Sequence, residues 1–432
     1  MAKSLMVASN PAWMIINDNT TRYFVLANAH LPTAGETSEA NTQITQRTAG
    51  VMSNLYAIVA DNTFFDDGVS SSTLRTRKNG LNGNQVLTIP HQAIGEFEDT
   101  THTDTIANGD EFNGQVVLPS AIGTKTVSFV VCSVVFNAPN INTVLRHAAT
   151  NFADMSDGNS YAFALSDNGD VLNTLFANAE FPFRAAGFIR GLFVKVSSNG
   201  NTSAGTNTVV TLYKNQVATG LSISIPANET VQTIFENTVD HVSVADGDTI
   251  CLVVDSVNSG AVILEIISVE WASTNFKFHS VFAYSGGGMT QQAGNDDYLP
   301  IGGGGVAFVL EPEANHRTEM QMACTVSHLM TYVSANTVSS FPGFGFGALI
   351  YIRKNSASTA VTVSVPEGGT GFYEDTTHSA SFAAGDEITI YSRLSGLSGS
   401  MVPRYMVCLI ENTEVAVTVH IKGGHIKGGK IL

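Results

Sequence analysis

One motif occurs three times in this chain and limits what it can fold into. Each copy has a lysine and an asparagine, followed by a stretch that ends in a proline 12 residues after the lysine. Asparagine tolerates the left-handed backbone of a tight turn, and proline ends a strand because it cannot donate to the ladder. In the second and third copies this stretch alternates apolar residues with Ser or Thr, so the motif predicts a β-hairpin. The lysine–proline pairs are Lys78 and Pro90, Lys214 and Pro226, and Lys354 and Pro366.

Further landmarks repeat around each hairpin at nearly one period. An asparagine ends the strand upstream, and a Gly-Asp turn follows downstream; successive asparagines are 137 residues apart and successive glycines 138. Landmarks in one order at one period indicate three copies of a domain, and a period this long indicates tandem domains rather than the short repeats of a solenoid. The landmarks are Asn62, Asn199 and Asn336, with Gly109, Gly247 and Gly385.

Length and composition agree with three β domains. A chain of 432 residues is too long for one hydrophobic core. Charged residues make up only 13%, and Gly, Ser, Thr and Asn, which favour strands and turns, take their place. No stretch shows a convincing helical stripe, and the best candidate for a short helix is Leu145–Met155.

We therefore predict an all-β chain of three tandem antiparallel jelly-roll-like β-sandwich domains, each with about eight strands. The expected domains are 1–145, 146–278 and 279–412, and residues 413–432 form a C-terminal extension. The nearly continuous apolar run Thr126–Phe136 is expected to be a strand buried on both faces.

Charge and cysteine content exclude several classes of protein. The formal net charge is −16 and no basic face is visible, so we expect no nucleic-acid partner. From the start of the sequence we expect no secretion signal, and because we find no stretch apolar enough for a membrane helix we expect no membrane insertion. The four cysteines lie in or beside apolar runs without a close pair, which predicts buried free thiols, no disulfide and no zinc site. They are Cys132, Cys251, Cys324 and Cys408.

The best candidate for a ligand site is a Glu-Asp-Thr-Thr-His segment in the first and third units. Residues four apart on a strand share a face, so its glutamate and histidine can both point outward to a divalent cation or another ligand. Asp and Thr at a strand end are also ordinary turn-capping residues, and this structural interpretation is favoured. The middle unit departs from the pattern over Glu236–His241 and is one residue longer. The candidates are Glu98, Asp99 and His102, with Glu374, Asp375 and His378.

The sequence contains no recognised catalytic motif. It has no Gly-x-Ser-x-Gly elbow, no His-Glu-x-x-His and no Walker loop. Paired carboxylates for glycoside cleavage stay open, because their pairing is spatial. We assign no catalytic residue, no metal and no cofactor, and expect a protein that is not an enzyme.

The C-terminus is a basic end on an acidic chain. The segment His-Ile-Lys-Gly-Gly occurs twice in succession from His420, after apolar residues that alternate from Val415 to Val419. Such an arm can dock on a neighbour by adding a strand to a sheet edge and placing lysines on carboxylates. A frayed tail is the alternative. The residues assigned to docking are Lys422, His425, Lys427 and Lys430.

The Lys-Asn hairpin, the Ile-Pro strand end, Glu-Asp-Thr and Ala-x-Gly-Asp together resemble virion proteins of tailed bacteriophages. The pattern is similar to the tumour-necrosis-factor-like β-sandwich modules of phage fibres and head decorations, and it covers all three units. The resemblance implies a structural virion component, made in the host cytoplasm and often trimeric. The departure at Glu236–His241 puts any shared ligand site of the middle unit in doubt.

From this resemblance we expect a capsid decoration or head-fibre protein whose partners are other virion proteins. A tail-associated protein that recognises a host surface glycan is the alternative, and a polysaccharide depolymerase is a third. For the assembly we favour a homotrimer whose equivalent domains stack along a threefold axis, since closed symmetry satisfies identical patches. The other arrangement is one chain whose three domains pack around a pseudo-threefold axis.

Overall fold

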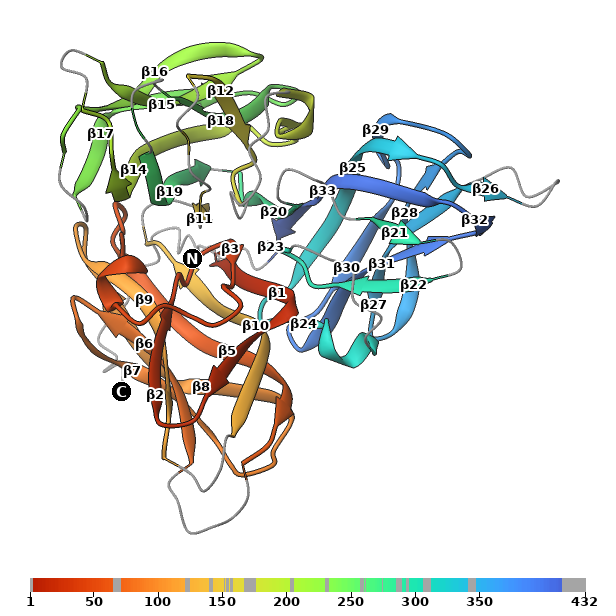
Figure 1. The fold of residues 1–432 in the computed structure, drawn as a ribbon. Helices are drawn as coiled ribbons and strands as arrows, with labels where there is room; N and C mark the ends of the chain where they lie inside the picture. Colours follow the sequence, from red (N-terminus) through yellow and green to blue (C-terminus); the bar gives the residue numbers. More distant parts are fainter. Residues whose placement is uncertain are drawn as a thin grey trace, which may run out of the picture.

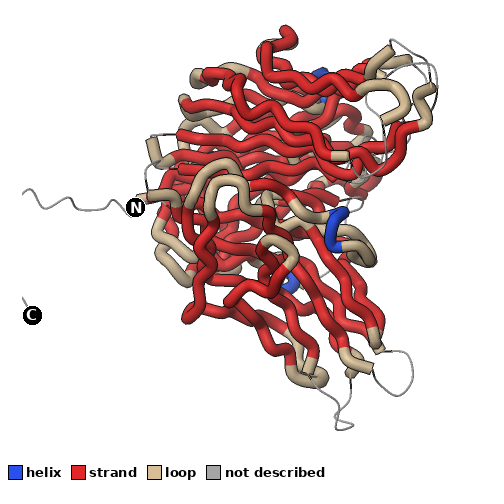
Figure 2. The backbone as a smooth tube through the Cα atoms, turned by 90° about the vertical axis from the view of Figure 1, so that its left-hand side faces the viewer, coloured by secondary structure: helices blue, strands red, loops and turns tan. Residues whose placement is uncertain are grey.

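The computed structural model is almost entirely β-strand (Figure 1). In the described part of the chain, helical backbone occurs only as short 3-10 turns, η1 (Glu39–Asn41), η2 (Phe176–Asn178) and η3 (Glu313–Asn315) (Figure 2). The predicted fold class of antiparallel β-sandwiches is confirmed. No helix among the described residues is long and apolar enough to cross a membrane. The structure describes residues 3–64, 71–120, 125–139, 143–150, 152, 155, 158–166, 176–202, 206–229, 233–256, 260, 262–273, 275–284, 290–292, 295–305, 312–340 and 347–413.

The first sandwich has one sheet of order β3-β1-β10-β5-β8 and another of order β2-β9-β6-β7, with β4 beside β9. Strand β10 is buried from Val127 to Phe136, as its apolar run predicts, because β1 and β5 pair with its two edges and other elements cover both faces. The strands are β1 (Lys3–Asn17), β2 (Thr20–Phe24), β3 (Ala29–His30), β4 (Ile44–Thr45), β5 (Gly50–Asn62), β6 (Ser72–Lys78), β7 (Leu81–Ile89), β8 (Gly95–Ile106), β9 (Glu111–Leu118) and β10 (Thr126–Asn137).

The second sandwich has sheets of order β11-β19-β14-β17 and β12-β18-β15-β16, with β13 beside β18. The short helix considered for Leu145–Met155 is wrong over residues 145–150, because β11 pairs residue by residue with β19 and that partner holds it extended. The strands are β11 (Thr143–Thr150), β12 (Ser160–Phe163), β13 (Phe181–Pro182), β14 (Gly187–Asn199), β15 (Thr208–Lys214), β16 (Val217–Ile225), β17 (Ile234–Val244), β18 (Thr249–Asp255) and β19 (Val262–Ser273).

The third sandwich has a sheet of order β23-β20-β33-β25-β29, with β21 beside β33 and β30 beside β25. Its other sheet has the order β22-β31-β27-β28, with β24 beside β31, and β26 pairs with β32. The strands are β20 (Lys277–Tyr284), β21 (Gln291–Gln292), β22 (Asp296–Leu299), β23 (Gly303–Gly305), β24 (Thr318–Met320), β25 (Cys324–Asn336), β26 (Ser339–Ser340), β27 (Ala348–Lys354), β28 (Ala357–Val365), β29 (Gly371–Glu374), β30 (Ser379–Phe382), β31 (Asp386–Leu394), β32 (Gly396–Ser398) and β33 (Ser400–Asn412).

The three Lys-Asn motifs are the hairpins β6–β7, β15–β16 and β27–β28, and all three have the same register. Each lysine pairs with the residue three positions later. The asparagine after each lysine has φ between 48° and 52°, the left-handed turn conformation expected from the sequence. The paired positions are Lys78 and Leu81, Lys214 and Val217, and Lys354 and Ala357.

The repeated landmarks contact one another inside each sandwich. Each hairpin lysine pairs with the aspartate of the downstream Gly-Asp turn at 2.8, 3.1 and 2.6 Å, in chain order. The neighbouring asparagine amide donates to the other oxygen of that aspartate at 2.7 to 2.8 Å. The upstream asparagine amide donates to the carbonyl of the strand-ending proline at 2.9, 3.0 and 3.1 Å. The landmarks share one period because they form one local structure.

The three sandwiches surround a common centre, and each contacts the other two (Figure 1). The first and second meet where Asn28 Nδ2 and His147 Nδ1 form a hydrogen bond of 3.1 Å. The first and third meet where the Ser9 hydroxyl donates to the Gly302 carbonyl at 2.7 Å. The second and third meet where His279 Nε2 accepts a backbone N–H at 2.9 Å. The domains of one chain thus pack in a pseudo-threefold ring rather than end to end, and the homotrimer stays a prediction.

Candidate functional site

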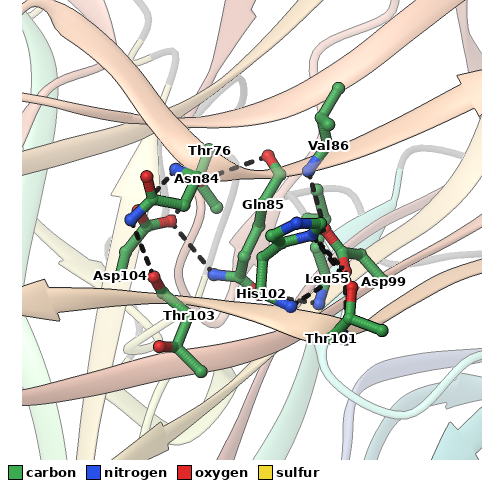
Figure 3. A network of polar contacts seen from close by, with 10 residues as sticks. All are labelled: Leu55, Thr76, Asn84, Gln85, Val86, Asp99, Thr101, His102, Thr103 and Asp104. Carbon is green, nitrogen blue, oxygen red and sulfur yellow. Dashed lines mark hydrogen bonds and ion pairs between the residues drawn. The ribbon is translucent and has the colours of Figure 1, made fainter.

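The predicted aspartate of the first unit, Asp99, is buried on β8 and caps a turn (Figure 3). Its carboxylate accepts hydrogen bonds from the backbone N–H groups of Val86, Thr101 and His102 at 3.0 to 3.1 Å, and His102 Nδ1 lies 3.0 Å from it. Burial by itself raises the pKa of this carboxyl, but the hydrogen bonds outweigh burial and hold the pKa of Asp99 at about 2. The His102 side chain remains 58% exposed.

Asp375 repeats this arrangement in the third sandwich. It accepts hydrogen bonds from the backbone N–H groups of Thr362, Thr377 and His378 at 2.9 to 3.1 Å, and these hold its pKa at about 2 against the opposite effect of burial. Among the described residues, no group of three or more His, Cys, Asp or Glu side chains is placed to hold a metal ion. Both aspartates are therefore engaged in their own turns.

The predicted glutamates reach toward other sandwiches instead. Glu374 is 6% exposed, and its carboxylate accepts hydrogen bonds from Arg184 Nε and Nη2 of the second sandwich at 2.7 and 2.5 Å. His328 Nδ1 lies 2.8 Å from the same carboxylate. Burial raises the pKa of Glu374, but Arg184 and His328 outweigh burial and hold the pKa below its usual range. Glu374 is thus an interface residue.

Equivalent glutamates occupy the other two interfaces. Glu98 accepts a hydrogen bond from Gln321 Nε2 of the third sandwich at 3.2 Å. Glu236, in the middle unit, forms an ion pair with Arg47 of the first sandwich. The sequence analysis singled out neither Arg47 nor Gln321, because each lies in a different sandwich from its glutamate and no local pattern links them.

Two buried histidines contribute to the interfaces as core residues. The His279 ring packs against Phe183 and Trp271, with centroids 4.5 and 6.4 Å apart. Desolvation lowers the pKa of both His279 and His147 to about 3. Both imidazoles are therefore neutral near pH 7.

The first sandwich contains a second buried carboxylate, Asp104, which the sequence analysis missed (Figure 3). It accepts hydrogen bonds from the Thr76 hydroxyl at 2.5 Å, the Asn84 backbone N–H at 2.6 Å and the Gln85 amide at 3.2 Å. The second sandwich has Val242 at the same ladder position. Because its partners satisfy Asp104, this network is structural.

One left-handed backbone position differs among the three interfaces. At the bulge beside the glutamate-bearing strand stand Asn54 (φ 54°), Gly191 (φ 59°) and His328 (φ 51°). Asn54 and His328 form hydrogen bonds with the interface glutamates of their own sandwiches at 3.3 and 2.8 Å. Glycine has no side chain to do so, and a hollow of about 320 Å³ lies at this place. The hollow is lined by Arg47, Asn108, Arg190, Gly191 and Thr238.

The C-terminal arm lies outside the described residues. The last described residues contact the start of the first strand, where the Asn412 amide donates to the Lys3 carbonyl at 3.0 Å. The predicted docking residues that fall outside are Lys422, His425, Lys427 and Lys430.

Comparison with known proteins finds no matching family model and no matching curated protein. Similar solved structures include PNGF-II in a C2 space group, with 10% identity over 61% of this chain and 65% of that chain and a TM-score of 0.22. The triple jelly roll protein of an archaeal virus turret has 9% identity over 92% and 91%, with a TM-score of 0.19. A chain from Sulfolobus Turreted Icosahedral Virus has 10% identity over 86% and 82%, with a TM-score of 0.18. Viral jelly-roll proteins are thus among the neighbours, at TM-scores that carry no functional argument.

Proposed function

We propose that the protein is a non-enzymatic structural component of a virus particle, a capsid decoration, cement or head-fibre protein of a tailed bacteriophage. The observation that carries the proposal is the pseudo-threefold ring, in which Glu98, Glu236 and Glu374 each contact another sandwich. Three similar units around one centre present three similar faces, and such a block matches a threefold position of a symmetric shell. Its partners would be other virion proteins.

The state of the acidic landmarks supports a role without catalysis. Asp99 and Asp375 cap turns, and Asp110 is held by its lysine and asparagine neighbours. Burial alone raises the pKa of Asp110, yet these contacts keep it at about 2. A general acid or base works best with a pKa near the operating pH, so these carboxyls are poorly suited to that task. Release of reducing sugar from host capsular polysaccharide by the purified protein would contradict this part of the proposal and support a depolymerase.

The assembly in solution is part of the proposal. One chain already closes a ring of three sandwiches, so we propose that the protein is a monomer in solution. The homotrimer expected from the sequence is the alternative. Light scattering distinguishes them, because a monomer has a mass of 45.7 kDa and a homotrimer three times that. The buried thiols are compatible with folding in the reducing host cytoplasm.

Localisation on particles is the decisive experiment. Gold-labelled antibodies against the protein should mark the capsid surface of purified virions, and no label should appear on particles from a phage that lacks the gene. Label confined to the tail would support the receptor-binding alternative. Absence from the virion would exclude both roles.

We propose that the C-terminal arm attaches the protein to an acidic surface of a neighbouring virion protein. Protein truncated after Thr413 should then bind capsids more weakly than the full chain, and Lys422, Lys427 and Lys430 changed together to glutamine should weaken binding in the same direction. Undiminished binding by the truncated protein would remove this role.

Receptor binding is kept as a second candidate because of one observation, the hollow at Gly191 between the first two sandwiches. The charged and aromatic side chains around this hollow indicate which class of ligand it would bind.

A further inference from the structure

We propose that the interface between the first and second sandwiches holds a binding site for a carboxylated saccharide, centred on Gly191. The proposal adds a ligand to the structural role and does not depend on where the protein sits in a particle.

Two adjoining hollows form the site. The hollow of about 320 Å³ at Gly191 shares Arg190 and Thr238 with a second hollow of about 310 Å³. Each falls within the size range of small-molecule sites. The second hollow adds Phe188, Val239, Asp240 and His241 to the lining.

A buried guanidinium lies beneath the floor of the first hollow. Arg146 is fully buried, and its Nε donates to the Ser268 hydroxyl at 3.1 Å, while Nη1 and Nη2 have no hydrogen-bond partner. Nη1 lies 3.3 Å from the point that a Cβ on Gly191 would occupy. Unpaired charged donors are costly to bury, so this group favours an anion nearby. Burial lowers the pKa of Arg146 to about 10, which leaves it charged near pH 7.

The charge around the first hollow is positive on a chain that is acidic as a whole. Arg47 pairs with Glu236, and Arg190 pairs with Glu270 at 2.8 Å. Arg146 is the third arginine of this cluster, and its two terminal nitrogens form a hydrogen bond with neither carboxylate. Around the first hollow, three guanidinium groups stand against two carboxylates, while Asp240 lies in the second hollow. The excess positive charge is therefore at the Gly191 end of the site, where a ligand carboxylate would balance it. Guanidinium groups match planar carboxylates well because their donors form a fork.

The second hollow provides a surface for a ring. Phe188 is 42% exposed, and its ring lies 5.8 Å from that of His241, edge to face. An aromatic face covers the apolar side of a sugar ring, while Asp240 and Thr238 can bond its hydroxyl groups. A simple anion such as phosphate would make no use of this surface. The combination therefore favours a carboxylated saccharide over a bare anion.

The equivalent positions of the other interfaces lack these features. Asn54 and His328 place side chains where the second sandwich has Gly191. Val51 and Thr325 stand at the ladder positions equivalent to Phe188. The site is specific to the middle unit, which is also the unit whose Glu236–His241 segment departs from the repeat.

Binding to the full chain tests the proposal. Isothermal titration should detect binding of D-glucuronate or N-acetylneuraminate, and this affinity should fall as the salt concentration rises. Glucose, phosphate and sulfate should bind weakly or not at all. Gly191→Asn introduces the residue that the first sandwich has at this left-handed position, so the fold should survive while the affinity falls by about tenfold or more. Phe188→Val should weaken saccharide binding in the same direction.

The matched control is Asn54→Gly, the reverse change at the equivalent position of another interface, and it should leave the affinity unchanged. Far-ultraviolet circular dichroism checks that each variant is folded. The proposal is overturned by a folded wild-type chain that binds neither acid at about 10 mM, by glucose or phosphate binding as tightly as glucuronate, or by unchanged affinity in Gly191→Asn.

Discussion

The interface between the second and third sandwiches is filled, whereas the one between the first and second is open, although equivalent strands build both. In the filled interface Glu374 is 6% exposed and contacts both Arg184 and His328. In the open one Glu236 is 20% exposed and is paired with Arg47. The repeat determines that a glutamate meets an arginine at both places, and the residue at the bulge determines whether space remains beside them.

The bulge can differ between units because its backbone is left-handed. Few side chains adopt that conformation without strain, and Asn and Gly are among the best tolerated. Exchange of glycine for asparagine or histidine there keeps the strand path and changes only what fills the interface. The repeated residues therefore maintain the ring, whereas a glycine at the bulge position is enough to open a site in one interface.

Substitution of the interface arginine should show the largest difference in stability between the two interfaces. We expect Arg184→Met to lower the free energy of unfolding by about 3 kcal/mol, because Glu374 is left as a buried charge without its main partner. Arg47→Met should cost about 1 kcal/mol, since water reaches Glu236. Urea denaturation of both variants measures the difference, and equal losses would contradict the distinction between filled and open interfaces.

Substitution at the bulge should have an intermediate effect. His328→Gly loses a hydrogen bond to a charged carboxylate but relieves a left-handed histidine, so we expect a net loss of about 1 kcal/mol. A double-mutant cycle with Glu374→Gln isolates the contact. Additive losses would show that His328 and Glu374 do not interact in solution.

The smallest expected effect concerns how the free energy of unfolding depends on pH. The filled interface and the interface between the third and first sandwiches should differ in this dependence. The lowered pKa of Glu374 contributes stability above the ordinary carboxyl pKa, and this is lost as the pH falls through its folded value. Desolvation and a hydrogen bond with Glu387 raise the pKa of Glu96 to about 7, with Glu319 acting in the same direction and Arg317 against it.

The contribution of Glu96 is therefore present below about pH 4.5 and is lost as the pH rises through about 7. Its side chain is partly exposed to solvent, so screening limits the loss to under about 1 kcal/mol. Denaturation between about pH 5 and 9 measures it, and Glu96→Gln should remove this dependence. A slope unchanged in that variant would assign the titration to another group.

The sequence by itself determined the parts of the fold that close within one unit. Alternation with a period of two, the Asn turn and the terminal proline identify the hairpins, because each depends on residues close in the chain. The contact between Lys78 and Asp110 follows from the repeat, since both belong to one local structure. The capping role of Asp99 was also the favoured interpretation, and its contacts with Thr101 and His102 fit it.

Only the tertiary structure decided what lies between the units. The partners Glu374 and Arg184 are 190 residues apart, and no local pattern specifies which surface carboxylate meets another sandwich. The same holds for Leu145, which is a strand residue because β19 offers it an edge. The ring and the hollow at Gly191 arise from the packing of whole sandwiches, which depends on the shape and burial of complete faces rather than on the order of neighbouring residues.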